Sequence, residues 1–221
     1  MDPLANINLI IVSIPPGAGS SFLGYLQKVY SGTKDYKTES QFPPLNFWDC
    51  MLQNVDLVQH WDSSLFGEFK TFTSIITEID LSSKTVFVNT HSFPTGDSPF
   101  NMEHVSHVLS VEGDLDAHLY MAKLKSLKTK NPKSSFDIND ITERATKAYE
   151  RQLTSKATFK PNTSINYNKF FIDVDRKEIS KFLIRTMEIK RIDEEKLDII
   201  CDMIAIYTRL NQALIKTTYN Q

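Results

Sequence analysis

Apolar runs of strand length alternate with amphipathic segments along much of the chain. The run at residues 8–14, NLIIVSI, is continuous and rich in β-branched residues, which is typical of a strand buried on both faces of a sheet. The runs at 85–89 (TVFVN) and 105–111 (VSHVLSV) predict two more buried strands, and 163–167 (TSINY) predicts a short fourth strand. The strands therefore lie far apart in the sequence, with room for helices between them.

Helical patterns occupy most of the sequence between and after these runs. Residues 31–44 are polar and predict a loop. Helices are expected at 20–30, 46–60, 64–79, 114–128, 137–156, 175–187 and 193–216.

Short apolar strands separated by helices predict an α/β fold with a mainly parallel sheet. We expect a three-layer sandwich with a central sheet of four to five strands, in a single domain that spans residues 1–221. In such sheets ligands bind beyond the carboxyl ends of the strands. The segments that follow the first and second strands should therefore lie close together.

Composition excludes several classes of function. The formal net charge is -2, so no global basic field exists to attract nucleic acid or an anionic membrane. No run of apolar residues is long enough for a membrane span. Cys50 and Cys201 are far apart and predict neither a disulfide framework nor a zinc site, which favours reduced thiols in a cytoplasmic protein.

A glycine-rich turn, PPGAGSS, joins the first strand to the first helix. Gly17 and Gly19 allow a tight turn and a close approach to a ligand. The backbone amides of Gly19, Ser20, Ser21 and Phe22 would lie in the first helical turn, where they attract an anion. The sequence therefore predicts a phosphate-binding loop, and the alternative is a turn that binds nothing.

The loop lacks the lysine of a nucleotide-kinase loop. When the pattern G-x-x-x-x-G-K-[ST] is aligned on Gly19, Ser20 stands at the lysine position. That lysine is the charge that kinases place on transferring phosphates, so its absence disfavours an active kinase.

A histidine follows the second strand. In the stretch TVFVNTHSFP, His91 lies just past the carboxyl end of the strand, where an α/β fold places catalytic groups. It could act as a general base near neutral pH, or it could be a structural histidine. His104 and His107 are three residues apart but have no third ligand in view, so no metal site is expected.

Three motifs, in the right order, resemble those of the sulfotransferases. The first is PGAGSSFL at residues 16–23, which fits P-x-x-G-[ST]-[ST]-x-[LW]. The second is NTHSFP at 89–94, similar to a strand that ends in K-T-H-x-x-P. The third is INYNKFFIDVDRKEISKFLI at 165–184, similar to a Y-E-D-L-like strand end followed by a P-x-x-E-I-x-x-F-L helix.

The resemblance implies a P-loop-like fold and a donor, 3′-phosphoadenosine-5′-phosphosulfate, with no metal. It implies that His91 takes the proton from a hydroxyl or amine of a small-molecule or glycan acceptor. It also implies that the donor's 5′-phosphosulfate is bound by the loop residues Pro16, Gly17, Ala18, Gly19, Ser20, Ser21 and Phe22.

The chain departs from the family at two cationic contacts. Gly17 stands where the family has lysine or arginine after the loop's proline. Glu112 and Tyr120 stand where an arginine and a serine read the donor's 3′-phosphate, and Lys123 and Lys125 are either substitutes for them or a solvated helix face. Three interpretations stay open: a different register, an altered donor site, or lost activity.

Three functions are thus compatible with the sequence. The first is a sulfotransferase that uses His91 and the loop at 15–22. The second is a catalytically degenerate protein with a P-loop fold that acts as a binding module. The third, which the missing lysine disfavours, is a nucleotide kinase-like protein.

Overall fold

The computed structural model describes residues 8–13, 15, 17–31, 85–90, 105–129, 137–158, 161–187 and 189–219. The loop predicted after residue 31 and the helices predicted at 46–60 and 64–79 lie outside the described residues. So does Cys50, whereas Cys201 is a free thiol on the last helix.

Helices and strands alternate along the described chain, close to the positions that the sequence predicts. The strands are β1 (Asn8–Ser13), β2 (Thr85–Thr90), β3 (Val105–Glu112) and β4 (Thr163–Asn166). The helices are α1 (Ser20–Ser31), α4 (Leu115–Thr129), α5 (Ile138–Thr158), α6 (Arg176–Met187) and α7 (Glu194–Tyr219), with one wide helical turn, η2 (Asn168–Ile172), between β4 and α6.

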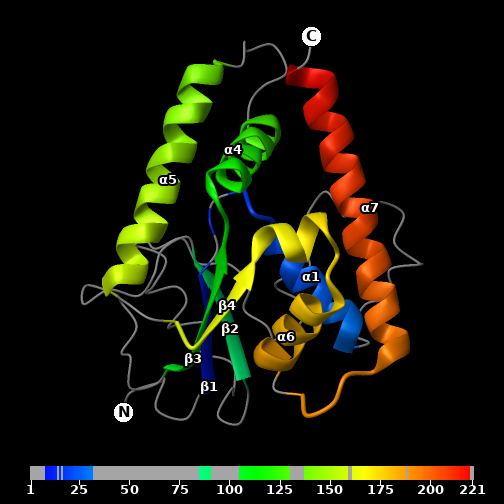
Figure 1. Ribbon diagram of the computed structural model, residues 1–221. Coiled ribbons are helices and arrows are strands. Elements are labelled where there is room, and N and C mark those ends of the chain that lie inside the picture. Colours follow the sequence, from blue (N-terminus) through cyan, green and yellow to red (C-terminus); the bar gives the residue numbers. More distant parts are fainter. Residues whose placement is uncertain are drawn as a thin grey trace, which may run out of the picture.

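The strands form one parallel sheet in the order β2-β1-β3-β4 (Figure 1). β1 pairs with β2 from Asn8 and Thr85 to Ser13 and Thr90, and on its other side it pairs with β3 as far as Ser13 and Ser110. The α/β class with a parallel sheet is therefore as predicted, while a fifth strand and the three-layer arrangement stay predictions. β2 follows β1 on one side, and β3 then pairs with β1 on the other side, so the strand order reverses between β1 and β3. In parallel sheets of this kind, ligands bind at the carboxyl ends of the strands at such a switch point.

One side of the sheet is covered by α1, α6 and α7 (Figure 1). Their facing apolar stripes form one core with the side chains of η2, and each fully buried side chain contributes about 1.5–3 kcal/mol to stability. The core includes Leu23, Leu26, Phe170, Phe171, Phe182, Leu183, Ile200, Met203 and Ile204.

On the other side of the sheet, α5 is fastened to the end of β3 (Figure 1). The side-chain amide of Gln152 accepts a hydrogen bond from the backbone N–H of Gly113 at 3.0 Å and donates one to its carbonyl at 2.8 Å. The same Oε1 lies 3.0 Å from Nε2 of His118, which therefore carries the proton. Burial lowers the pKa of His118, so this histidine is a neutral structural residue.

Replacement of Gln152 by alanine tests this attachment. Gln152→Ala removes three hydrogen bonds and leaves both backbone groups of Gly113 unpaired, so we expect a loss of about 2–3 kcal/mol in the free energy of unfolding. Urea denaturation measures it. Gln212→Ala, on an exposed position of α7, is the control and should change stability by less than about 0.5 kcal/mol. Equal effects of the two variants would show that Gln152 does not hold α5 in place.

Candidate functional site

The carboxyl ends of three neighbouring strands meet at one edge of the sheet. Ser13 at the end of β1 is level with Thr90 of β2 and with Ser110 of β3. The loop after β1 and the end of the second strand therefore lie together, as the sequence predicts. His91 follows Thr90 directly in the sequence and lies outside the described residues.

The loop after β1 turns through two glycines with left-handed backbones. Gly17 has φ +91° and Gly19 has φ +86°, conformations that side chains disfavour. The N–H of Ala18 donates to the carbonyl of Pro15 at 3.1 Å, and the carbonyl of Gly19 accepts the first helical hydrogen bond, from Leu23, at 2.9 Å. The amides of the first turn of α1 have no acceptor within the helix, so this end of α1 favours an anion.

The remaining loop residues of the predicted site differ in whether their side chains are buried in the core. Ala18 and Phe22 are buried, with exposed fractions of 2% and 1%, so their side chains belong to the core. The backbone N–H of Ala18 already donates to the carbonyl of Pro15. Ser20 and Ser21 open α1. Their side chains, and all of Pro16, lie outside the described residues.

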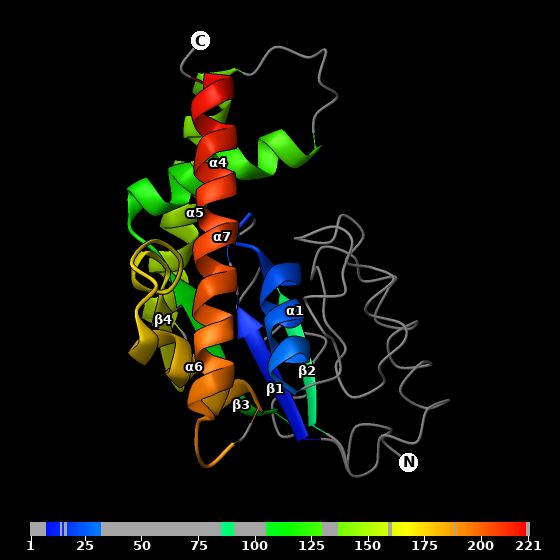
Figure 2. The ribbon, with the colours of Figure 1, turned by 90° about the vertical axis from the view of Figure 1, so that its right-hand side faces the viewer.

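Helix α4 crosses this loop at van der Waals distance (Figure 2). A Cβ on Gly17 would lie 2.2 Å from the carbonyl oxygen of Met121 and 3.2 Å from Cβ of Lys125. The helix starts directly after β3, because Oδ1 of Asp114 accepts a hydrogen bond from the N–H of Ala117 at 2.8 Å and caps its first turn. The end of β3 thus directs α4 over the loop.

Helix α7 covers the other glycine. The ring of Tyr207 stacks on Phe22 with centroids 3.9 Å apart, and its Oη would lie 3.0 Å from a Cβ on Gly19. The next residue, Thr208, donates a hydrogen bond from Oγ1 to the carbonyl of Phe171 at 2.7 Å, which fixes α7 against η2. The loop is therefore held between two helices from distant parts of the chain.

Three tyrosine hydroxyls approach each other beside the loop. The rings of Tyr120 and Tyr167 lie 6.3 Å apart. Burial raises the pKa of Tyr167, and the proximity of Tyr120 and Tyr207 raises it further. The pKa of Tyr120 is likewise raised by burial and by Tyr207. The hydroxyls of Tyr120 and Tyr167 thus stay protonated and able to donate hydrogen bonds.

Two buried groups near the loop lack a partner among the described residues. They are Oη of Tyr120, on α4, and Nδ2 of Asn211, one helical turn beyond Tyr207 on the buried face of α7. Asn211 is 7% exposed. A buried donor without a partner costs about 1–3 kcal/mol, and such groups indicate a missing water, ion or ligand.

Glu112, which stands in place of an arginine of the resembled family, is neutralised within the protein. Its Oε1 accepts hydrogen bonds from Ser110 and Ser164, both at 2.7 Å, and its Oε2 from Lys156 of α5 at 2.6 Å. Burial acts to raise the pKa of Glu112, but the hydrogen bonds from Lys156, Ser110 and Ser164, with the charge of Lys156, lower it overall. The carboxylate is thus bound on the α5 side and presents no unpaired charge.

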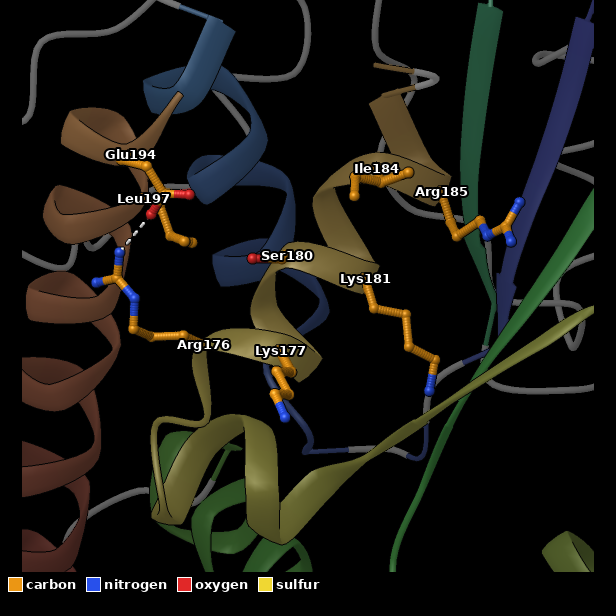
Figure 3. Close-up of a pocket in the computed structure, with 8 residues that line it drawn as sticks. All are labelled: Arg176, Lys177, Ser180, Lys181, Ile184, Arg185, Glu194 and Leu197. Carbon is orange, nitrogen blue, oxygen red and sulfur yellow. Dashed lines mark hydrogen bonds and ion pairs between the residues drawn. The ribbon is translucent and has the colours of Figure 1, made fainter. Parts of the chain in front are cut away.

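A hollow of about 460 Å³ lies along α6 (Figure 3). Its wall at Glu194 is about 20 Å from Tyr207 along the axis of α7. Arg176 pairs with Glu194 and Asp198, and Lys181 with Glu178, so acidic groups neutralise part of its positive charge. We assign no function to it. Its lining is Arg176, Lys177, Ser180, Lys181, Ile184, Arg185, Glu194 and Leu197.

The described part of the chain contains neither a group of side chains for a metal ion nor a helix that could cross a membrane. No group of three or more histidine, cysteine, aspartate or glutamate side chains in it is placed to hold a metal ion. None of its helices combines the length and the apolar character that a membrane crossing requires.

The sequence matches no family model and no curated protein sequence. The structure is similar to retinol dehydratase, solved with retinol and PAP (13% identity) and with androsterone and the inactive cofactor PAP (11%), each with a TM-score of 0.47 over 94% of this chain and 66% of that one. It is also similar to shikimate kinase from Bacteroides thetaiotaomicron (14% identity, TM-score 0.40, 82% and 96% of the chains).

The chain spans just under two thirds of the length of retinol dehydratase. Structures solved with PAP are thus among those that it resembles. Superpositions with TM-scores below 0.5 are loose, so the function proposed below depends on the residues of this chain.

No sequence pattern indicates that Tyr207, Asn211 and Tyr120 contribute to the site. Tyr207 belongs to the apolar period of α7, which a core residue explains equally well. Asn211 is a polar residue at a buried position of the same helix. Because buried amides need hydrogen-bond partners, this position is the signal from which a ligand contact could have been predicted.

The two glycines of the loop should differ in their tolerance of alanine. Gly17→Ala places a Cβ against the backbone of α4 at φ +91°, so we expect a loss of about 3 kcal/mol or more in the free energy of unfolding. Gly19→Ala meets only the hydroxyl of Tyr207, so about 1–2 kcal/mol is expected. Thermal and urea unfolding measure both.

A double variant supplies the control. In the Tyr207→Phe background the contact at 3.0 Å is gone, and Gly19→Ala should cost less than in the wild type. If Gly17→Ala were as mild as Gly19→Ala, the close crossing of α4 over the loop would be refuted.

Glu112 should make stability depend on pH below its ordinary pKa. Because folding lowers the pKa of Glu112, the ionised carboxylate stabilises the fold above pH 4.5, and this contribution is lost as the pH falls through the lowered value. Glu112→Gln should therefore be less stable than the wild type by about 1 kcal/mol near pH 7 and equal to it in acid. Unfolding curves at several pH values measure the difference.

Glu143→Gln is the matched control, because Glu143 also pairs with a lysine of α5, Lys147, but on the exposed surface. Solvent screens that pair, so little change is expected at any pH. A pH-independent difference for Glu112→Gln would mean that the charge of Glu112 has no part in stability.

Proposed function

We propose that residues 1–221 form a single sulfotransferase-like domain that moves a sulfonate group from 3′-phosphoadenosine-5′-phosphosulfate to an acceptor. The observation that carries the proposal is the loop after β1. Two left-handed glycines place the amides at the start of α1 beside the switch point between β1 and β3. Backbone amides in this arrangement suit the 5′-phosphosulfate of the donor, bound by residues 15–22.

The proposed chemistry needs a base at the same edge of the sheet. His91 follows β2, whose last residue pairs with the last residue of β1. In this role His91 takes the proton from an acceptor hydroxyl or amine while the acceptor atom bonds to sulfur. The bond between sulfur and the bridging oxygen breaks, and adenosine 3′,5′-bisphosphate leaves. The loop amides stabilise the negative charge that develops on its 5′-phosphate.

The buried donors beside the loop support an anionic ligand at this place. Tyr120 and Asn211 each have a donor atom that is buried and has no partner among the described residues. A ligand rich in acceptor oxygens would satisfy such groups. The acceptor substrate, a small molecule or a glycan, is proposed from the family resemblance. The placing of the protein in the cytoplasm is proposed from the two separate cysteines of the sequence.

A catalytically degenerate binding module is the second candidate. It is favoured by the closure of the loop, since α4 touches Gly17 and Tyr207 touches Gly19. Such a protein would bind its ligand without turnover. A nucleotide kinase-like function is disfavoured, because Ser20 takes the place of the lysine.

Binding of adenosine 3′,5′-bisphosphate tests the proposal. At a hundred times its dissociation constant the nucleotide should add about 2.7 kcal/mol to the free energy of unfolding, which raises the melting temperature by roughly 5–10 °C. Adenosine is the control, because without phosphates it should give a much smaller shift. The absence of any shift at millimolar nucleotide would refute the proposal.

The variant His91→Gln separates transfer from binding. It should bind adenosine 3′,5′-bisphosphate as the wild type does, because the loop is intact, but should lose sulfonate transfer by roughly 10²–10⁴-fold. The rate of transfer is measured by the release of adenosine 3′,5′-bisphosphate from the donor in the presence of acceptor mixtures. Binding without turnover in the wild type would favour the binding module instead.

A further inference from the structure

We propose that Lys125 of α4 supplies the positive charge of the phosphate loop that residue 17 lacks. This inference rests on the function proposed above and adds a residue to its donor site. It assigns Lys125 to the 5′-phosphate bound by the loop after β1, as a binding residue that comes from a distant segment of the chain.

The structure first excludes a cation at residue 17 itself. A Cβ there would lie 2.2 Å from the carbonyl oxygen and 3.0 Å from the carbonyl carbon of Met121. Real Cβ atoms do not come this close to backbone, so neither lysine nor arginine fits at this position while α4 keeps its place. The space that such a side chain would occupy is filled by one turn of α4.

The same turn of α4 brings a lysine to the loop. Met121 and Lys125 are four residues apart and share a face of the helix. Met121 is buried, and Lys125 is exposed with its Cβ 3.2 Å from the Cβ position of Gly17. A four-carbon stem that starts beside the loop allows the ammonium group to reach an anion bound at the amides of α1.

The neighbouring lysine of α4 is placed differently. Nζ of Lys123 lies over the ring of Tyr219, 5.7 Å from its centroid, and the carbonyl of Lys123 accepts a hydrogen bond from Tyr219 at 3.4 Å. Lys123 therefore serves the contact between α4 and the end of α7. Two lysines that are separated by one residue thus have distinct surroundings, and only Lys125 borders the loop.

Independent support for a ligand at this place comes from the unused donors. Tyr120 is the residue before Met121 on α4, and its Oη is buried without a partner among the described residues. Nδ2 of Asn211 is likewise buried without a partner among the described residues, and Asn211 lies one helical turn beyond Tyr207, which covers Gly19. A phosphate beside Lys125 would lie between α4 and α7, the helices that carry these donors.

The test compares Lys125→Met with Lys123→Met, which are matched in length, helix and charge change. Isothermal titration with adenosine 5′-phosphate should show about tenfold weaker binding for Lys125→Met and no change for Lys123→Met. Lys125→Arg should bind within about threefold of the wild type. The loss in Lys125→Met should shrink as salt is raised, because salt screens an exposed charge.

Adenosine 3′-phosphate distinguishes the two ends of the nucleotide. Lys125→Met should leave its affinity unchanged. If the loss appears with the 3′-phosphate instead, or if both methionine variants bind like the wild type, the assignment of Lys125 is wrong although the proposed function stands. If the wild type binds neither these two nucleotides nor adenosine 3′,5′-bisphosphate, the proposed function is wrong, and so is the assignment of Lys125 that rests on it.

Discussion

The close crossing of α4 over the loop after β1 is the constraint on which the candidate site depends. It requires a residue without a side chain at position 17, since Met121 occupies the place of any Cβ. The crossing is set by the end of β3, where Asp114 caps α4 and Gln152 holds Gly113. The loop, α4 and α5 on the other side of the sheet are therefore joined by a chain of contacts, although the loop is more than a hundred positions from Met121 and Gln152 in the sequence.

The sheet was predictable from the sequence because most of its strands are short runs of apolar and β-branched residues. β1 and β3 appear as continuous apolar runs that are too short for helices, and glycine and proline mark the turn after β1. Helix bounds were also close: the sequence predicts a last helix at 193–216, and α7 extends from Glu194 to Tyr219. The order β2-β1-β3-β4 depends on which strands pair, and no local pattern reports that.

The candidate site was predictable only in its backbone. Glycines that need positive φ can be found in a sequence, and Gly17 and Gly19 both have it. Contacts between distant segments cannot be found in this way. The sequence suggests that Glu112 would repel a phosphate, but it holds no sign that Lys156 and two serines would pair with this carboxylate. Tyr207 looked like a core residue, and it is one, yet it also covers Gly19.

The way in which the site supplies positive charge bears on the choice between kinase-like and sulfotransferase-like chemistry. A nucleotide kinase gathers a loop lysine and a metal around a γ-phosphate, because several negative charges converge there. A phosphosulfate carries one charge on its phosphate and one on its sulfonate, so it needs fewer cations. In the proposed function, the backbone amides at α1, the hydroxyls of Tyr120 and Tyr167 and Lys125 of α4 would form a weakly cationic site of this second kind. In this proposal, the close crossing of α4 excludes a cationic side chain from position 17, and the same crossing brings Lys125 of α4 beside the loop.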